Sequence, residues 1–250
     1  MSEINIFSNC RGLSTLSIPS SVSDIGDGAF TDTGWYNNQD DGILYLDKWL
    51  VGYKGNKPTN GINIHEGIKG VTGLANCTEL TSIAIPSSVS FIGSDAFMGC
   101  TKLLTVFIPT SIKSIGKIAF SDCTSLTNVY CLSETVPSIS SDAFDYVPLD
   151  DATLYVPKKS IEAYRNVVPW KMFGNIIGIA HISDGDFNGD GNVDTTDLNL
   201  MVKAVLENMS AESNNEKFDI NGDGLLNVED IVMYVKMIKL KESLRQILRA

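Results

Sequence analysis

The fold is decided by the stretch CTELTSIAIPSSVSFIGSDAF, residues 77–97, because the next part of the chain repeats its pattern. Residues 100–120 read CTKLLTVFIPTSIKSIGKIAF, so that Cys, Leu, Ile-Pro, Ile-Gly and Ala-Phe return after 23 residues. An earlier copy runs from Cys10 to Phe30, and a later copy, with one extra residue, runs from Cys123 to Phe144. A fixed period of this length predicts a solenoid, since each coil is too short to bury its own apolar residues and must stack on its neighbours.

Each repeat contains an alternating Leu-x-x-Ile-x-Ile segment, which predicts a short strand, and stacking the coils places these strands in a parallel ladder. The side chains between the two buried positions of each strand are expected to face outward: Ser17, Asn63, Ala84, Phe107 and Tyr130. Phe107 and Tyr130 are thereby predicted to be adjacent exposed aromatics. Two interpretations stay open, a contact patch for a protein or glycan and a pair that only shields the sheet.

Two segments depart from the period. Residues 31–74 form an insertion, in which residues 44–51 predict a β-hairpin turning at Asp47-Lys48 and residues 62–71 predict a shortened coil, so the insertion is expected to belong to the solenoid. Residues 152–179 are predicted to form a C-terminal cap with a strand at 153–157 and a short helix capped by Ser160. The apolar cover of this cap is expected to come from Trp170, Phe173, Ile176 and Ile177.

The repeat unit resembles the BspA-like, treponemal-type leucine-rich repeat of bacterial surface proteins, over roughly residues 6–179. The resemblance implies a leucine-rich-repeat solenoid of mainly β or α/β class. It also implies an extracellular or cell-surface location, and a role in adhesion through protein or glycan recognition rather than catalysis.

Two further segments, residues 186–197 and 219–230, fit a twelve-residue calcium loop and begin 33 residues apart. Calcium prefers six to eight oxygen ligands, which such a loop supplies from side chains at positions 1, 3, 5, 9 and 12 and a carbonyl at position 7, with Gly at position 6 for the sharp turn. Two Ca²⁺ ions are therefore predicted, with solvated turns and magnesium as the weaker alternatives. The expected ligands are Asp186, Asn188, Asp190, Asn192, Asp194 and Asp197 in the first loop, and Asp219, Asn221, Asp223, Leu225, Asn227 and Asp230 in the second.

The apolar spacing predicts a helix after each loop but none before it, which argues against an EF-hand. A duplicated loop-then-helix unit resembles a type I dockerin, over about residues 183–240. The resemblance implies a small all-α calcium domain that docks on a cohesin-like partner, whose choice is set by Thr195 and Thr196 in one half and Val228 and Glu229 in the other. An alternative is that the calcium domain only rigidifies the chain.

The net charge of the 250-residue chain is −11, and residues 180–250 alone hold 13 acidic and 7 basic residues. Acidity of this size disfavours nucleic acid as a partner, since phosphate backbones are repelled. No apolar stretch approaches the roughly 18 residues of a membrane span. The amphipathic end at 240–250 is expected to pack on the domain, with a membrane-surface helix as the alternative. The first residues lack a basic and apolar leader pattern, so no secretory signal is expected within them.

The five cysteines are expected to be free, buried and unreactive, because four occupy one repeat position and Cys131 replaces a buried Ile. His65 and His181 have no ligand-like spacing, and the sequence contains no recognised catalytic motif. We therefore expect a non-enzymatic binding protein with a repeat domain at 1–179 and a calcium domain at 180–250. The alternative is an accessory component of a polysaccharide-degrading complex or a glycoside hydrolase-associated protein.

Overall fold

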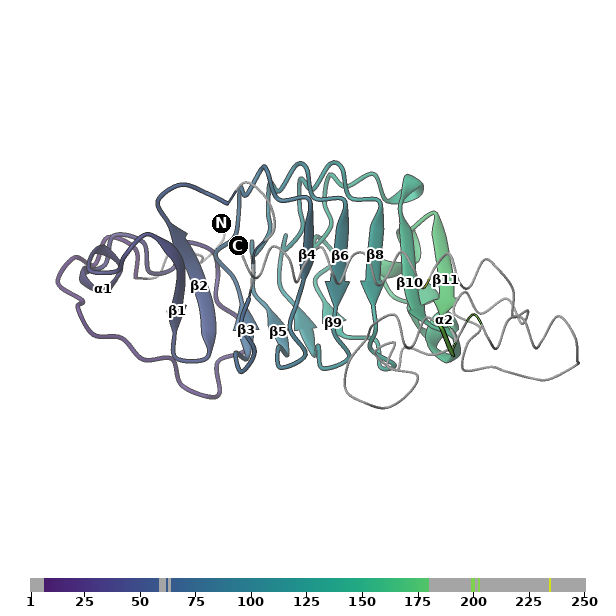
Figure 1. The fold of residues 1–250 in the computed structure, drawn as a ribbon, viewed down its shortest axis with the longest axis horizontal. Coiled ribbons are helices and arrows are strands. Elements are labelled where there is room, and N and C mark those ends of the chain that lie inside the picture. Colours follow the sequence, from purple (N-terminus) through teal and green to yellow (C-terminus); the bar gives the residue numbers. More distant parts are fainter. Residues whose placement is uncertain are drawn as a thin grey trace, which may run out of the picture.

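A computed structural model describes residues 7–58, 62 and 64–179, together with the isolated positions 199, 200, 202 and 234. Within these residues the chain winds into stacked coils that carry two sheets (Figure 1). Each full coil places one strand in each sheet, which confirms the solenoid expected from the 23-residue period. In this part of the chain no helix is long and apolar enough to cross a membrane.

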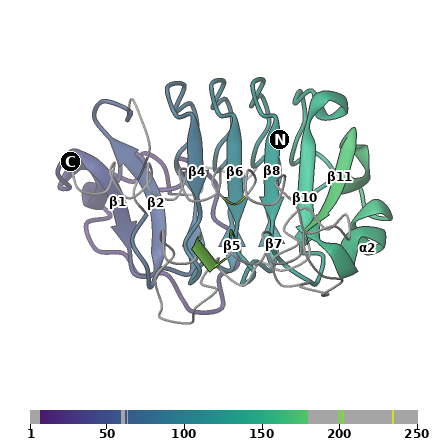
Figure 2. The ribbon, with the colours of Figure 1, turned by 45° about the vertical axis from the view of Figure 1, so that its right-hand side comes forward.

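The five-stranded sheet has the order β11-β10-β8-β6-β4, and all of its pairs are parallel. Its strands stand side by side in Figure 2. The strands are β4 (Ser82–Ala84), β6 (Thr105–Ile108), β8 (Asn128–Cys131), β10 (Thr153–Pro157) and β11 (Asn175–Ile179). Equivalent residues of successive coils pair directly, so Val106 lies opposite Ile83 on one side and Val129 on the other.

The six-stranded sheet has the order β1-β2-β3-β5-β7-β9. Its strands are β1 (Gly42–Leu46), β2 (Trp49–Lys54), β3 (Gly70–Val71), β5 (Phe91–Ile92), β7 (Ser114–Ile115) and β9 (Ser138–Ile139). β1 and β2 form the predicted antiparallel hairpin, and Asp47 in its turn has a φ of 50°. Because β2 pairs with β3, and β3 with β5, the hairpin and the segment after it extend the ladder.

The core is a column of equivalent residues between the two sheets. Cys77, Leu80, Phe97 and their counterparts in the next two coils are fully buried, apart from Phe144, which is 3 % exposed. Phe120 stacks between Phe97 and Phe144, with centroid distances of 5.2 and 5.3 Å. Parallel strands about 4.8 Å apart bring such residues to this separation, so the repeat builds a continuous apolar column.

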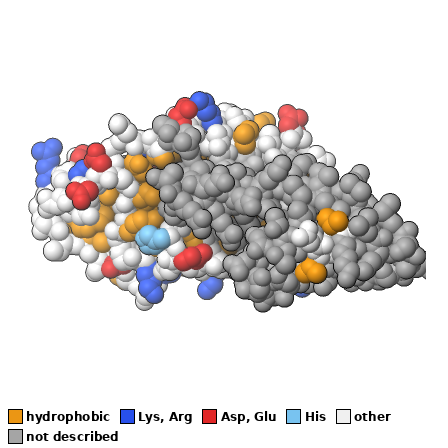
Figure 3. Space-filling model, in the orientation of Figure 1, with side chains coloured by type: hydrophobic (Ala, Val, Ile, Leu, Met, Phe, Trp, Pro, Cys, Tyr) orange, Lys and Arg blue, Asp and Glu red, His pale blue; other side chains and the backbone are white. Residues whose placement is uncertain are grey.

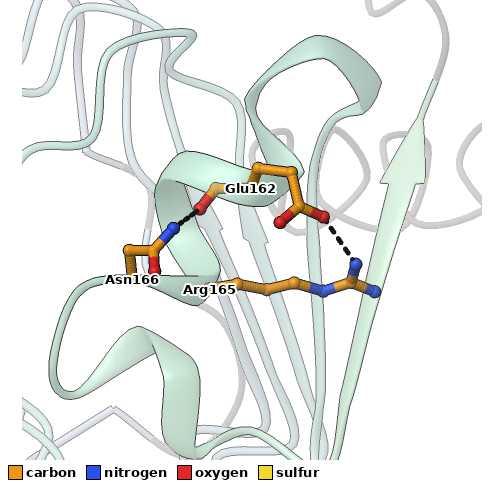
Figure 4. Close-up of polar contacts among 3 residues, drawn as sticks. All are labelled: Glu162, Arg165 and Asn166. Carbon is orange, nitrogen blue, oxygen red and sulfur yellow. Dashed lines mark hydrogen bonds and ion pairs between the residues drawn. The ribbon is translucent and has the colours of Figure 1, made fainter.

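The C-terminal end of the ladder holds most of the short helices. They are η1 (Leu149–Asp151), η2 (Lys158–Ser160), α2 (Ile161–Arg165) and η3 (Trp170–Met172). Ser160 stands before α2 as predicted, but it does not cap the helix, because its hydroxyl donates to the carbonyl of Glu134 instead. On the exposed side of α2, Glu162 pairs with Arg165 and its carbonyl accepts from Asn166 (Figure 4).

Trp170 and Phe173 are buried at this end, as expected of a cap, and Ile176 is half-buried. Ile177 was expected to join them and does not. It is 37 % exposed, because Tyr155, its partner in the neighbouring strand, points outward and Ile177 follows the same alternation.

The first repeat, residues 10–30, was predicted to add a strand to the ladder. This prediction is wrong, since the repeat contributes no strand to either sheet. It packs against the hairpin in a second apolar cluster that includes Ile25, Phe30, Leu44 and Trp49. α1 (Gly34–Asn37) follows, and Thr33 caps it by accepting from the amide of Tyr36. The hairpin and β3 occupy the place beside β5 in the six-stranded sheet, where the first repeat would have stacked.

This arrangement leaves much of the first repeat exposed. Cys10 was expected to be buried like Cys77 and Cys100, but it lies at the surface because no coil stacks on it. Leu16 and Ile18 are only half-buried, whereas Ile83 and Ile85, which correspond to them in the next repeat, are buried. Figure 3 shows hydrophobic side chains at the surface of the end that carries α1, β1 and β2.

Candidate functional site

The outward face of the five-stranded sheet carries an aromatic row. The strands β6, β8 and β10 alternate between buried and half-buried residues, and Val106, Val129 and Leu154 are fully buried. The residues that follow these three point outward and lie opposite one another in the parallel register. Together with the flanking strands they define the aromatic row: Ala84, Phe107, Tyr130, Tyr155 and Ile177.

The three rings of this row form one stack. The centroids of Phe107 and Tyr130 are 4.5 Å apart with an interplanar angle of 11°, and those of Tyr130 and Tyr155 are 4.3 Å apart with an angle of 7°. The in-register strands set this separation, because their spacing is about 4.8 Å. Neighbouring rings cover each other's faces, so the stack presents mainly ring edges to a partner.

The two ends of the aromatic row differ. Ala84 is too small to continue the stack, and no ring of the described residues covers the Phe107 face on that side. At the other end, Ile177 extends the apolar surface beyond Tyr155. The row is therefore an apolar ridge that crosses all five strands.

A polar row runs beside the aromatic row, one outward position earlier in each strand. It consists of Ser82, Thr105, Asn128, Thr153 and Asn175, which are paired in the same register. The five strands contain no charged residue. The face thus offers hydroxyl and amide groups without a formal charge.

The two phenols stay neutral. Burial, followed by the adjacent Tyr155 phenol, raises the pKa of Tyr130 above its ordinary value. Burial likewise raises the pKa of Tyr155. The sheet face therefore keeps its neutral character throughout the physiological pH range.

Two of the predicted outward residues, Phe107 and Tyr130, are adjacent and outward-facing, and Ala84 lies beside them. Both aromatics are half-buried rather than exposed, because the neighbouring rings cover each other. Ser17 is exposed but lies in no strand, so its predicted place on the ladder is wrong. Asn63 falls outside the described residues.

Tyr155 and Ile177 were not predicted on this face, because residues 152–179 were interpreted as a separate cap. A signal for Tyr155 was present. Thr153-Leu-Tyr-Val156 has the alternation of Asn128-Val-Tyr-Cys131, and aligning the two would have placed Tyr155 next to Tyr130.

The predicted calcium and docking residues lie outside the described part of the chain. This holds for both loops, residues 186–197 and 219–230, and for Thr195, Thr196, Val228 and Glu229. They remain predictions. Elsewhere, among the described residues, no three His, Cys, Asp or Glu side chains converge closely enough to hold a metal ion.

The buried cysteines serve the core. The thiols of Cys100 and Cys123 donate to the carbonyls of Leu74 and Phe97, with sulfur–oxygen distances of 3.3 and 3.2 Å. Burial raises the pKa of Cys123 to about 12, so its thiol stays protonated. These cysteines join each coil to the preceding one and offer no nucleophile.

Comparison with known families agrees with this architecture. The BspA type leucine rich repeat region matches residues 3–38 and 58–166 in six copies, and the dockerin type I domain matches residues 184–239. Both families are binding or docking modules rather than catalytic ones, and dockerin type I domains bind calcium. The two resemblances drawn from the sequence are thereby confirmed.

Among the solved structures that are similar to the chain, three are leucine-rich repeat proteins. A leucine rich cell surface protein from Faecalibacterium prausnitzii A2-165 is 20 % identical over 72 % of this chain and 51 % of its own, with a TM-score of 0.43. A leucine-rich repeat protein from Bacteroides ovatus ATCC 8483 is 16 % identical over 62 % and 48 %, with a TM-score of 0.32. The leucine rich repeat protein of T. pallidum is 23 % identical over 56 % and 71 %, with a TM-score of 0.31.

The chain spans about half the length of the first two of these proteins. No curated protein matches it. The repeat family covers more than half of the chain, and its strand ladders are those of the described structure. The chain therefore belongs to the BspA-type leucine-rich repeat family and carries a dockerin type I domain after its repeats.

Proposed function

We propose that this chain is a non-enzymatic extracellular binding protein. The repeat domain, residues 1–179, recognises a protein partner through the aromatic row, and the module at 180–250 attaches the chain to a cohesin-like domain through residues 183–240. BspA-type repeats and dockerins are typical of secreted or surface proteins, which supports this location. The observation that carries the proposal is the stack of Phe107, Tyr130 and Tyr155 on an uncharged sheet face.

A protein surface suits this row better than a glycan does. Sugars pack their C–H groups against open aromatic faces, and Phe107, Tyr130 and Tyr155 turn most of theirs toward one another. Ring edges, in contrast, meet the aromatic and aliphatic side chains of a protein in edge-to-face contacts. The neutral polar row beside them supplies hydrogen-bond groups at the rim of such a contact. The biological role that follows is adhesion to a surface protein.

The role of the aromatic row in binding is tested by substituting two of its aromatic residues. Surface-fraction proteins of the producing bacterium are captured on the full chain, and the affinity of the recovered partner is measured for the Phe107→Ala, Tyr130→Ala double variant. Loss of two central aromatics is expected to cost at least about 2 kcal/mol, or about 30-fold in Kd. Tyr146→Ala is the matched control, since Tyr146 is an aromatic that is 78 % exposed and outside the sheets. Unchanged affinity of the double variant, or selective binding of glycans in a parallel array, contradicts the proposal.

The docking half of the proposal depends on calcium. We propose that each predicted loop holds one ion, and that the first loop, with four carboxylates against three, holds it more tightly. Calorimetric titration of the full chain is expected to show two sites. Asp186→Ala and Asp219→Ala, at the same position of the two loops, are each expected to remove one site. Asp194→Asn is expected to weaken the tighter site, and no effect on it contradicts the assignment.

Attachment is measured separately. The full chain is expected to bind at least one member of a cohesin panel in calcium and to lose that binding in a chelator. Calcium binding without attachment to any cohesin contradicts the docking role and favours a module that only rigidifies the chain.

A further inference from the structure

The first repeat is attached to the ladder at Ser94 as well as at Lys69, whose ammonium donates to the carbonyls of Ser20 and Val22. The carboxylate of Asp24 accepts from both the backbone amide and the hydroxyl of Ser94, each at 2.8 Å. The amide of Asp27 donates to the carbonyl of Ser94 at 3.2 Å. These three bonds join segments almost 70 residues apart in sequence, and they lie in the turn that follows β5.

The next residue, Asp95, is a buried carboxyl with an unfilled bonding position. Asp95 is only 3 % exposed, and the Oδ2 atom of its carboxyl has no hydrogen-bond partner among the described residues. Its main chain is held in place, with a φ of 58° and an amide that donates to the carbonyl of Lys117. An ionised carboxylate in such a position is costly, because a buried charge needs a partner.

The charges that face Asp95 make ionisation costlier. The carboxylates of Asp27 and Asp24 come from the first repeat, and that of Asp142 comes from a later turn of the ladder. Burial first, and then these three charges, raise the pKa of Asp95 from 3.8 to about 6. Burial also raises the pKa of Asp27, which Lys57 only partly offsets. The charges that raise the pKa of Asp95 are thus all carboxylates of the described residues.

We propose that the junction between the first repeat and the ladder is a proton-controlled latch, which holds while Asp95 is protonated and loosens when Asp95 is ionised. Two of the three opposing carboxylates belong to the first repeat, so moving that repeat away relieves both the repulsion and the burial. Release would also uncover the apolar surface of Leu44 and Trp49 on which the repeat packs. The latch is independent of the binding functions proposed above.

The sign of the effect follows from linkage. The docked state binds a proton more tightly than the released state, whose Asp95 is solvated and has an ordinary pKa. Docking is therefore strongest at low pH and weakens as the pH rises through the docked-state pKa of about 6. Between pH 5 and pH 7 the docking equilibrium constant is expected to fall about tenfold, with little further change above pH 7.

Amide exchange of the full chain tests the latch. After correction for intrinsic rates, protection of the Asp27 amide, which bonds to Ser94, is expected to fall about tenfold from pH 5 to pH 7 relative to the Phe120 amide, which bonds within the ladder to Ala143. Asp95→Asn is expected to abolish this difference. Asp122→Asn is the matched control, because Asp122 also has a φ of 58° but is exposed, and it is expected to keep the difference.

A carbon-13 titration of the Asp95 carboxyl in the unsubstituted chain keeps the test independent of whether Asp95→Asn folds. We expect a midpoint near 6, lowered by Asp27→Asn. A midpoint near 4 overturns the proposal. So does a persistent pH dependence in Asp95→Asn, or an equal loss of protection at Phe120, which would show that the whole domain responds rather than the junction.

Discussion

The backbone of Gly93, in the turn after β5, lies directly against the carbonyl oxygen of Ile25 in the first repeat. A methyl group at Gly93 would overlap that oxygen. The close approach lets the adjacent Ser94 meet Asp24 and Asp27 at hydrogen-bonding distance. The Gly of the Ile-Gly pair therefore has two roles here. It allows the chain to bend after the strand, and its lack of a side chain allows the first repeat to pack closely against the turn.

Gly93→Ala is expected to separate the first repeat from the ladder. Losing the junction's hydrogen bonds costs on the order of 1–3 kcal/mol, and the cost appears first as lost protection of the Asp27 amide. Gly12→Ala is the control, since a methyl group there meets nothing within 4 Å. Equal protection of Asp27 in both variants would show that the close contact with Ile25 does not govern docking.

Phe120→Ala is expected to lower the free energy of unfolding by about 3–5 kcal/mol, because it opens a cavity in the middle of the phenylalanine column. Phe107→Ala provides the comparison, since it removes the same side chain from the outward face. Its cost is expected to be smaller by at least about 1 kcal/mol, because water can fill the vacated space. Urea denaturation of both variants measures the difference, and equal losses would contradict the assignment of Phe107 to a surface row.

Only one of the five thiols is expected to react rapidly with a labelling reagent in the native protein. Cys10 is exposed, whereas Cys77, Cys100, Cys123 and Cys131 are fully buried. Raising the pH to 9 should not recruit the others. Burial raises the pKa of Cys131 to about 11 and that of Cys123 to about 12, and the hydrogen bond with Cys77 raises the pKa of Cys100. The same bond lowers the pKa of Cys77, but its sulfur lies in the core, where a reagent has no access. Mass spectrometry of the labelled chain, with a Cys10→Ser variant as the control, counts the sites. A second fast site would show that a coil opens in the native state.

Tyr164→Phe is expected to cost about 1–3 kcal/mol, because it leaves the carbonyl of Ser133 without its donor. The Tyr164 hydroxyl donates to that carbonyl at 2.8 Å and lies 3.2 Å from the sulfur of Cys131. Burial raises the pKa of Tyr164, so the loss should be the same at pH 6 and pH 9. Tyr146→Phe, at a highly exposed tyrosine, should change the free energy of unfolding by less than about 0.5 kcal/mol. Comparable losses in the two variants would argue against the buried bond.

The repeat pattern predicted the regular part of the ladder, because stacking requires the same residue type at the same position of every coil. The strands β4, β6 and β8 and the adjacency of Phe107 and Tyr130 follow from it. The second strand of each coil, in β5, β7 and β9, was not predicted, because each is only two residues long. The hairpin at Asp47 was predicted from its own alternation and not from the period. The period could not show that the first repeat leaves the ladder. Cys10 and Leu16 match the consensus, yet their burial depends on a neighbouring coil, and here the hairpin takes that neighbour's place.

Other differences have local causes. Ser160 has the residue type of a helix cap, but the carbonyl of Glu134 lies within reach of its hydroxyl and forms the bond instead. Asp95 is not one of the positions that the repeat pattern defines. Its burial depends on residues 24–27 folding over it, a contact that no local pattern encodes.

The separation of inward and outward residues within each strand has an evolutionary consequence. The inward residues of each strand pack against the equivalent residues of the strands on either side. Phe107, Tyr130 and Tyr155, in contrast, each occupy one outward position on a different strand. Substituting one of these aromatic residues changes a single strand and leaves the buried apolar column unchanged. The outward residues can therefore change one at a time, and the sheet can be lengthened by duplicating a coil, without any change in the buried column.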